Sequence, residues 1–414
     1  MMRLLILLLV LFPNLHSLRA EIPSWGSSPM RLEDCIQRAL ADEPTAQLLR
    51  ARQLAAEALL QKARTLPNPV FAYTAQDIGV QTATGPALLH QLQISHPVLV
   101  SYLRTQEARV ARAAREQAEA QIAEDRRQIR LAVGRAYFDA VLSERLVELE
   151  HQAVAAAAEL VVQTQRRVQH GDIGTFDSDR AQAEQLDARR REEQAIRRSA
   201  LARLSLSVLL GADEPFLVSV PAVFVESSEP TIEPTARLAS ARAVRPDLRA
   251  ARAALAQAHE HERLEARRAI PIAELQVIGG VRIAAPGVGG LLALSLPLPL
   301  FDHNAGSRTA AAAQVQSARA AWTILERQVA AELVAAERDH QSASEALLRI
   351  ARPQVTLRES TLRGARRLFA EGMASLLDVV AAQRDLLAAR RSLAEAEHDV
   401  ALSAFRLRLT QGMQ

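Results

Sequence analysis

Few side chains in this sequence have the spacing that an active site or a metal site needs. The 414 residues include ten histidines and one cysteine. His259 and His261 could each bind a metal ion, but residues two apart on a helix point to different faces, so a solvated helix surface explains them better. His303 lies between Asp302 and Asn304, which are typical turn residues. The spacings of zinc sites, Gly-rich phosphate loops and nucleophile motifs do not occur, so we expect no catalysis, cofactor or bound metal.

Two aspartates stand out because they occupy equivalent places. Asp177 follows Gly171 by six residues, and Asp378 follows Gly372 by six residues. Both glycines are predicted to turn a long helix back on itself, so each aspartate falls at the start of a returning helix. A negative charge there is favoured by the helix macrodipole, which is the simplest explanation of both residues.

Charge and cysteine content exclude further classes. Lys and Arg number 50 and Asp and Glu 47, well mixed in sign, so a nucleic-acid partner is not expected. Cys35 cannot form an internal disulfide and lies too far from the start of the chain to be a lipid-attachment cysteine. We interpret it as a buried apolar side chain rather than a reactive thiol.

The elements that position these residues come from an internal duplication. Segments 170–211 and 371–412 share thirteen identities in 42 positions at an offset of 201. Three prolines recur at an offset of 202: Pro44, Pro69 and Pro97 match Pro246, Pro271 and Pro299. We therefore predict two copies of one unit, residues 21–214 and 235–414, joined by a connector at 215–234.

Segment 371–412 carries a heptad pattern with large and small side chains on alternate rows. Large residues recur every seven positions at Val379, Leu386, Leu393, Val400 and Leu407. Small residues keep the same period three positions later at Ala382, Ala389, Ala396 and Ser403. Because small side chains let a partner helix approach closely, this segment is predicted to be one arm of an antiparallel coiled coil.

A long helix precedes each arm. No proline occurs between Pro97 and Pro215, which predicts a helix over 102–170 that is about 100 Å long. Gly171 and Gly174 then turn the chain into a returning helix.

The second copy is expected to repeat this arrangement. Its first helices are predicted at 236–243 and up to Arg268, and its long helix from Ala305 to Glu371, with a break at Pro353.

Two segments alternate with a period of two residues. The first, 70–96, is predicted to be a hairpin with its turn at 79–86, and the second has strands at 273–283 and 291–296 around a Gly-rich turn. Strands near ten residues long have the length that a tilted membrane strand requires.

Segment 1–20 is predicted to be a secretory signal peptide. A basic residue, Arg3, precedes an apolar run from Leu4 to Phe12, and Ala20 is a suitable cleavage position. The run is too short to span a bilayer, and no other uninterrupted apolar run approaches the roughly 20 residues of a membrane helix. Any later membrane contact is therefore expected to use strands.

Together these features resemble the outer membrane efflux protein family, the TolC-like exit ducts of Gram-negative bacteria. The resemblance spans essentially the whole mature chain through the motifs RLEDCIQRALADEP, RPDLRAARA, SLPLPLFDHNAG and EGMASLLDVVAAQRDLLAARRSLAEAE. The LPLPLFDHNAG motif is most similar to the heavy-metal branch, the outer membrane components of cobalt, zinc and cadmium efflux systems. PVLVSYLRT departs from the Gly-Gly-Lys-Arg-like turn of that branch.

The resemblance implies a mainly α fold with a small β part: an internally duplicated α-helical barrel with two β-hairpins per chain, which join a twelve-stranded outer-membrane barrel in a homotrimer. It implies a passive duct without enzyme activity, with outer membrane lipid, a periplasmic adaptor (membrane fusion protein) and an inner-membrane RND transporter as partners. It also implies a constricted periplasmic tip that contacts the adaptor, formed by Gly171, Gly174, Asp177, Gly372, Leu377 and Asp378, with the aspartates as an acidic ring.

The expected cargo is heavy-metal cations. An organic-solute duct of the same family and a secreted coiled-coil protein without a pore are the alternatives.

Overall fold

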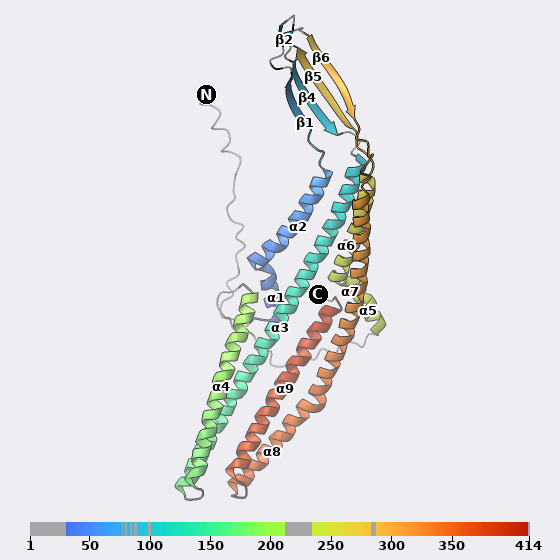
Figure 1. Ribbon diagram of the computed structural model, residues 1–414. Coiled ribbons are helices and arrows are strands. Elements are labelled where there is room, and N and C mark those ends of the chain that lie inside the picture. Colours follow the sequence, from blue (N-terminus) through green and yellow to red (C-terminus); the bar gives the residue numbers. More distant parts are fainter. Residues whose placement is uncertain are drawn as a thin grey trace, which may run out of the picture.

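The molecule is long and narrow, with a small sheet at one end and two helical hairpins at the other (Figure 1). The computed structural model describes residues 30–414 except 77, 79–80, 83–84, 87–88, 98–100, 212–233, 283–286 and 413–414. The predicted signal peptide, the predicted connector up to residue 233 and half of the predicted turn at 79–86 therefore lie outside the described residues.

The first half of the chain supplies the left part of the molecule in Figure 1. Its elements are α1 (Leu32–Ala41), α2 (Glu43–Arg64), β1 (Val70–Gln76), the short strands β2 (Gln81–Thr82) and β3 (Gly85–Pro86), β4 (Leu89–Pro97), α3 (Ser101–Gln169) and α4 (Thr175–Leu209). At 69 residues, α3 confirms the predicted helix of about 100 Å. Pro44 lies in the first turn of α2, where its missing N–H costs nothing.

The second half repeats this order of elements. It consists of α5 (Pro234–Val244), α6 (Pro246–Arg268), β5 (Glu274–Arg282), β6 (Gly287–Ser295), α7 (Ala305–Ala346), a π-helical turn (Leu347–Ala351), α8 (Arg352–Ala370) and α9 (Leu376–Thr410). Among the described helices, none is both long and apolar enough to cross a membrane.

Equivalent contacts end the two returning helices. Gly211 and Gly412, which match each other in the duplication, both adopt a positive φ, of 67° and 81°. A Cβ on Gly211 would collide with the side chain of Asp42, and a Cβ on Gly412 would lie 3.1 Å from Val244, the counterpart of Asp42 in the second copy. Each returning helix therefore ends close to the start of the second helix of its own copy.

The last strand begins four residues earlier than the sequence pattern predicted. We expected a Gly-rich turn before a strand at 291–296, but β6 begins at Gly287. Gly289 and Gly290 lie opposite Gly280 and Gly279 of β5. Glycine has a low strand propensity and no side chain that could alternate, so only the pairing across the hairpin reveals these strand residues.

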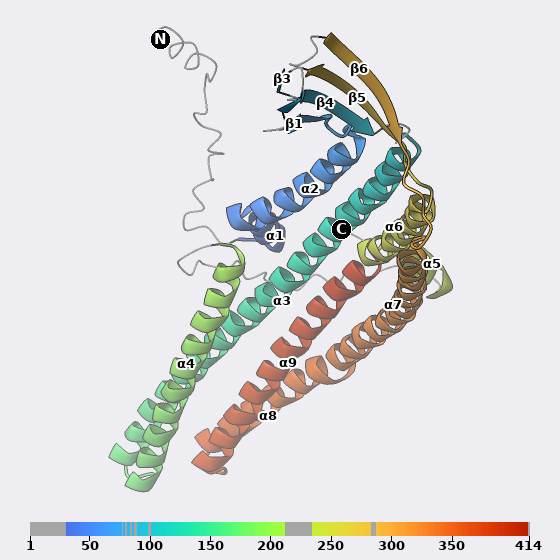
Figure 2. The same ribbon diagram turned by 45° about the horizontal axis from the view of Figure 1, so that its top comes forward.

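The long helix of the second copy does not break at Pro353 as predicted. The π-helical turn at Leu347–Ala351 connects α7 to α8, and Pro353 lies in the first turn of α8. Figure 2 shows α8 continuing α7 with a bend. A proline clashes with the carbonyl four residues before it, and the wider π turn accommodates this clash without ending the helix.

Two buried clusters hold the helices together. One surrounds Cys35, where α1 packs on α3 and on the ends of the returning helices. Burial, followed by the nearby Asp34 carboxylate, raises the pKa of the Cys35 thiol to about 12, so the thiol is protonated and unreactive at neutral pH. The other cluster lies near the turns between the long helices and contains Leu160 of α3 and Val379 of α9.

The sheet has one apolar face and one more polar face. Its strand order is β1-β4-β5-β6, all antiparallel, so β1 and β6 are its edges. Residues paired across an antiparallel sheet share a face. One face carries the exposed apolar side chains Phe71, Tyr73, Leu92, Ile94, Val277, Leu292 and Leu294. The other face carries Thr74, Gln91, Gln93, Ser95 and Gln276, together with the apolar Val70, Ile278 and Leu291.

Candidate functional site

The two turns farthest from the sheet lie side by side at one end of the molecule (Figures 1 and 2). Gly171 and Gly372 end the long helices with φ of 81° and 76°, the left-handed conformation that favours glycine. In both turns the next amide donates to the carbonyl five residues back, at 2.9 and 2.8 Å. This hydrogen bond ends a helix and reverses the chain, so the predicted turning role of both glycines is confirmed.

Asp378 caps the returning helix α9. Its carboxylate accepts hydrogen bonds from the Ser375 hydroxyl at 2.7 Å and the Ser375 amide at 2.9 Å, and its own amide donates to that hydroxyl. These hydrogen bonds, the hydroxyl first, hold the pKa of Asp378 below its usual value. The exposed carboxylate therefore stays negative and stabilises the helix start, as the macrodipole interpretation predicted.

Asp177 occupies the equivalent position without the same capping. The residue before α4 is Gly174, which has no side chain that could cap the helix. Within the described part of the chain, the Asp177 carboxylate forms no hydrogen bond or ion pair. The two predicted site aspartates thus lie at neighbouring turns but differ in how firmly they are held.

Apolar side chains project from both turns beside these charges. Leu377 is 47% exposed, whereas its neighbour Leu376 is 3% exposed and packs into the nearby core cluster. Phe176, the residue equivalent to Leu377, is 71% exposed, and Met373 is exposed as well. Leu377 was among the predicted tip residues, but Phe176 and Met373 were not, because an apolar residue next to a helix cap is normally assigned to the core.

Arg167 joins the two turns directly. Its guanidinium donates a 3.0 Å hydrogen bond to the carbonyl oxygen of Phe369 and lies 4.6 Å from the centre of the Phe369 ring. Arg167 belongs to α3 and Phe369 to α8, so the contact links one copy of the repeat to the other. We refer to these two turns, residues 170–174 and 371–375, with the first turns of α4 and α9, as the tip.

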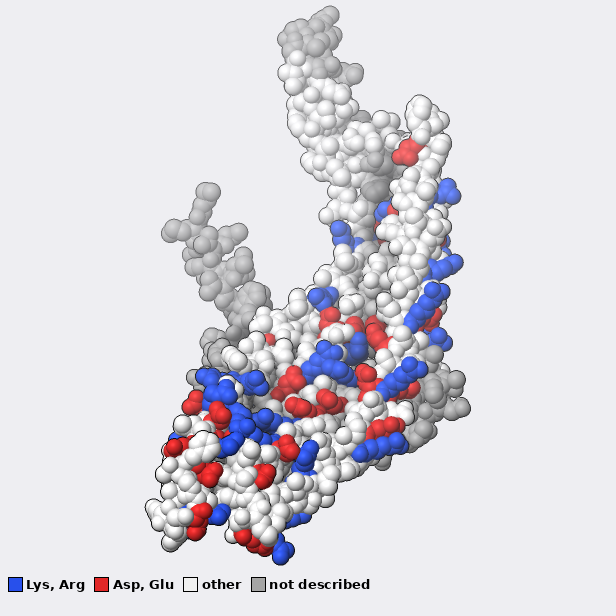
Figure 3. Space-filling view, turned by 60° about the horizontal axis from the view of Figure 1, so that its bottom comes forward, with Lys and Arg blue, Asp and Glu red and all other residues white. Residues whose placement is uncertain are grey.

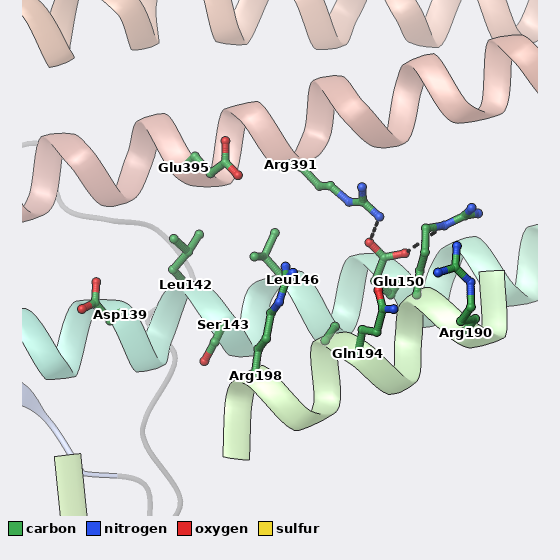
Figure 4. A pocket seen from close by; sticks show the side chains of 12 residues that line it. Asp139, Leu142, Ser143, Leu146, Glu150, Arg190, Gln194, Arg198, Arg391 and Glu395 are labelled. Atoms are coloured by element: carbon green, nitrogen blue, oxygen red, sulfur yellow. Dashed lines mark hydrogen bonds and ion pairs between the residues drawn. The ribbon is translucent and has the colours of Figure 1, made fainter. Parts of the chain in front are cut away.

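A cavity of about 560 Å³ lies above the tip between α3, α4 and α9. Figure 4 shows Glu150 inside it, reached by Arg391 from α9. Arg191 of α4 lies 3.7 Å from the same carboxylate. Glu150 is only 3% exposed. A carboxylate this buried needs partners, because removing it from water is costly.

A second buried carboxylate extends this ion-pair network. Glu184 of α4 pairs with Arg191 at 3.0 Å and with Arg384 of α9. Carboxylates of the first copy thereby form ion pairs with guanidinium groups of the second copy. The sequence did not predict this contact, since mixed charges on long helices are usually solvated. Figure 3 shows that positive and negative side chains are mixed over the helices near the tip.

The histidines considered in the sequence are not brought together. His259 lies 3.6 Å from Glu262 and His261 lies 3.7 Å from Glu265, so the two rings face different partners. Asp302 accepts the Asn304 amide at 2.8 Å in the turn that contains the exposed His303. Among the described residues, no group of three or more His, Cys, Asp or Glu side chains is arranged to hold a metal ion.

Known proteins have sequences similar to that of this chain. The family model for outer membrane efflux proteins matches residues 238–412. The cobalt-zinc-cadmium resistance protein CzcC of Cupriavidus metallidurans is 26% identical over 372 residues, which cover 87% of this chain and 85% of CzcC. Both comparisons point to the outer membrane efflux protein family.

Solved structures of similar channels have the same fold as this chain. The outer membrane protein VceC of Vibrio cholerae matches with a TM-score of 0.75 at 19% identity, over 92% of this chain and 96% of VceC. CusC, whose structures describe transmembrane channel formation, matches with a TM-score of 0.78 at 16% identity, over 93% of each chain. The predicted TolC-like fold is confirmed. The matching family and the similar solved structures are outer membrane efflux proteins and channels, not enzymes.

Proposed function

We propose that this protein is the outer-membrane exit duct of a tripartite efflux system and that it passively conducts heavy-metal cations. The observation that carries the proposal is the similarity to CzcC, which extends over nearly the full length of both chains. Because CzcC is a cobalt, zinc and cadmium resistance protein, divalent cations of this kind are the expected cargo. The cations would pass along the duct, so the pore wall does not need a coordinating site.

The sheet supports a location in the outer membrane of a Gram-negative bacterium. Its apolar face fits contact with lipid and its more polar face fits a water-filled interior. The edges β1 and β6 have no partner strand within the described chain. Unpaired edges are costly in lipid, so we propose that three copies close one barrel of twelve strands.

The helices would then extend through the periplasm with the tip toward the inner membrane. Exposed Phe176, Met373 and Leu377 fit a protein contact, and we propose that a periplasmic adaptor covers them and connects the duct to an RND transporter. In a trimer, three copies each of Asp177 and Asp378 would place six carboxylates around the entrance and concentrate cations there.

The duplication would give this trimer nearly six-fold symmetry. We propose that residues 21–214 and 235–414 are the two copies, with 215–234 as their connector and residues 1–20 as the signal peptide. Each copy contributes one strand pair and one helical hairpin, so a trimer has six similar units.

Metal retention in cells tests the proposed cargo. A host strain without this protein should retain more cobalt, zinc and cadmium after loading, and expression of the wild-type chain should restore their release. A hydrophobic dye, measured in the same cells, tests for organic-solute efflux. Unchanged metal retention together with increased dye retention would assign the duct to organic solutes instead.

A further inference from the structure

A strongly basic pocket lies where the helices meet the sheet. It has a volume of about 490 Å³ and is formed by the last turn of α2 and the first three turns of α3. Its lining residues are Ala63, Arg64, Arg104, Thr105, Ala108, Arg109 and Arg112. Four of the seven are arginines and none is acidic. We refer to it as the arginine pocket.

The charges of the arginine pocket are not neutralised by the protein. Within the described part of the chain, none of its four guanidinium groups forms an ion pair with a carboxylate. Other arginines on the same two helices are paired: Arg52 of α2 with Asp125, and Arg115 of α3 with Glu119 at 2.8 Å. Four unpaired positive charges around one pocket repel each other, and a bound anion would relieve this repulsion.

One arginine of the pocket is also held in place by α2, while one of its hydrogen-bond donors stays unused. Arg104 donates to the carbonyl oxygen of Arg64, one of the last carbonyls of α2 that have no partner within the helix. The Nε of Arg104 is buried and has no hydrogen-bond partner. The contact with α2 thus orients a guanidinium group at the pocket.

The fold does not require these arginines. At the offset of the shared prolines, the second copy has Ala266, Gly306, Ala311 and Gln314 at the four positions. The second copy forms the same sequence of helices and strands with these uncharged residues. The basic charge of the pocket is therefore better explained by a ligand than by stability.

The place of the pocket indicates what the ligand is. Arg64 lies six residues before β1 begins at Val70, and Arg104 lies seven residues after β4 ends at Pro97. This step rests on the proposed function, which puts the sheet in the outer membrane. The pocket is then level with the periplasmic surface of the bilayer, below the exposed apolar side chains of Val70 and Phe71.

We infer that the arginine pocket binds the phosphate group of an anionic phospholipid from the periplasmic leaflet. Guanidinium groups bind phosphate through paired, charge-assisted hydrogen bonds, and basic pockets beside membrane segments recognise anionic headgroups. The acyl chains of the lipid would lie along the apolar face of the sheet. A free phosphate ion has no such apolar part and would gain only the charge contact.

The test uses the full-length protein purified in detergent, with lipid binding measured by native mass spectrometry. The pocket variant combines Arg109→Gln and Arg112→Gln and keeps Arg104, which holds α2. The matched control combines Arg308→Gln and Arg319→Gln, two exposed arginines of α7 that form no ion pair within the described chain. Phosphatidylglycerol is the probe, and phosphatidylcholine and inorganic phosphate are added separately for comparison.

We expect wild type and control to bind phosphatidylglycerol in preference to phosphatidylcholine, with up to one tightly held lipid per chain. The pocket variant should bind phosphatidylglycerol at least about tenfold more weakly. Equal binding by the pocket variant would overturn the inference, and so would inorganic phosphate that displaces the lipid at a similar concentration. Fractionation of wild-type cells separates the two proposals, because a protein absent from the outer membrane would contradict the proposed function even if the pocket binds lipid in detergent.

Discussion

Ala188 and Ala389, which match each other in the duplication, are both almost fully buried, with 1% and 2% of their surfaces exposed. Ala188 lies on α4 and Ala389 on α9, the returning helices of the two copies. The small residues of the heptad pattern thus mark the line along which each returning helix is packed against its neighbours, as the sequence predicted. A longer side chain has no space on this line.

Replacing Ala389 by Leu should destabilise the protein by about 1 to 3 kcal/mol, because the added carbon atoms overpack a closed contact. The matched control is Ala200→Leu, which makes the same change at an exposed position of α4. Thermal unfolding of the purified proteins should show a lower midpoint for Ala389→Leu only. Equal midpoints would mean that the small residues do not pack.

Replacing glycine by alanine should have opposite effects on stability in a turn of the tip and within a helix. Gly372→Ala forces a side chain into a left-handed conformation and should cost about 1 to 2 kcal/mol. Gly364→Ala lies within α8, with no atom within 4 Å of the new Cβ, and should stabilise the helix by up to about 1 kcal/mol. Denaturant unfolding of both variants measures the difference, and a shift in the same direction for both would contradict the conformational argument.

Protonation of His398 should make stability depend on pH. Burial lowers its pKa, but its ring nitrogens lie 3.1 Å from Asp139 and 3.1 Å from Asp399, and these hydrogen bonds raise the pKa above 6.5. A raised folded-state pKa stabilises the protein fully below the unfolded pKa, and this stabilisation is lost as pH rises through the folded pKa. The stability advantage of wild type over His398→Gln should therefore be largest near pH 6 and smaller at about pH 9.

Thermal unfolding at several pH values checks this expectation. His303→Gln serves as the control because His303 is exposed in a turn. If the difference in unfolding midpoint between wild type and His398→Gln is the same at all these pH values, the ion pair of His398 contributes no protonation-linked stability.

The charge of Asp378 should matter to cations at the entrance of the duct. Asp378→Asn keeps an oxygen that can accept the Ser375 hydrogen bonds but removes the negative charge. In planar bilayers, a trivalent cation added on the periplasmic side should block the wild-type current more strongly than the current of this variant. Asp302→Asn, at the opposite end of the helices, should behave like wild type. If Asp378→Asn is blocked as strongly as wild type, Asp378 acts as a helix cap only.

Sequence analysis could predict features that depend on local periodicity. The absence of proline indicated the length of α3, the alternation around Leu92 and Ile94 indicated a strand, and the repeated glycines indicated both turns of the tip. These features depend on contacts between residues close in the sequence.

Contacts between distant residues could not be predicted. Glu150 pairs with Arg391, 241 residues later, and each residue alone has the appearance of a solvated helix position. The strand residues around Gly289 are recognisable only from their partners in β5, and Pro353 is tolerated because of a π turn that no local pattern announces. Exposure of Phe176 likewise follows from its place at the tip rather than from its type.

The central claim is that the protein crosses the outer membrane with its sheet and extends into the periplasm with its helices. Ile78, beyond β1, is 75% exposed, and Phe176, at the tip, is 71% exposed. The native Cys35 is fully buried and should not react. A single substitution, Ile78→Cys or Phe176→Cys, therefore places one reactive thiol at either end of the molecule.

Labelling of these thiols by a membrane-impermeant maleimide on intact cells is the most direct test. We expect the Ile78→Cys protein to be labelled on intact cells and the Phe176→Cys protein to be labelled only after the outer membrane is permeabilised. Labelling of Phe176→Cys on intact cells, or protection of Ile78→Cys until permeabilisation, would contradict this expectation.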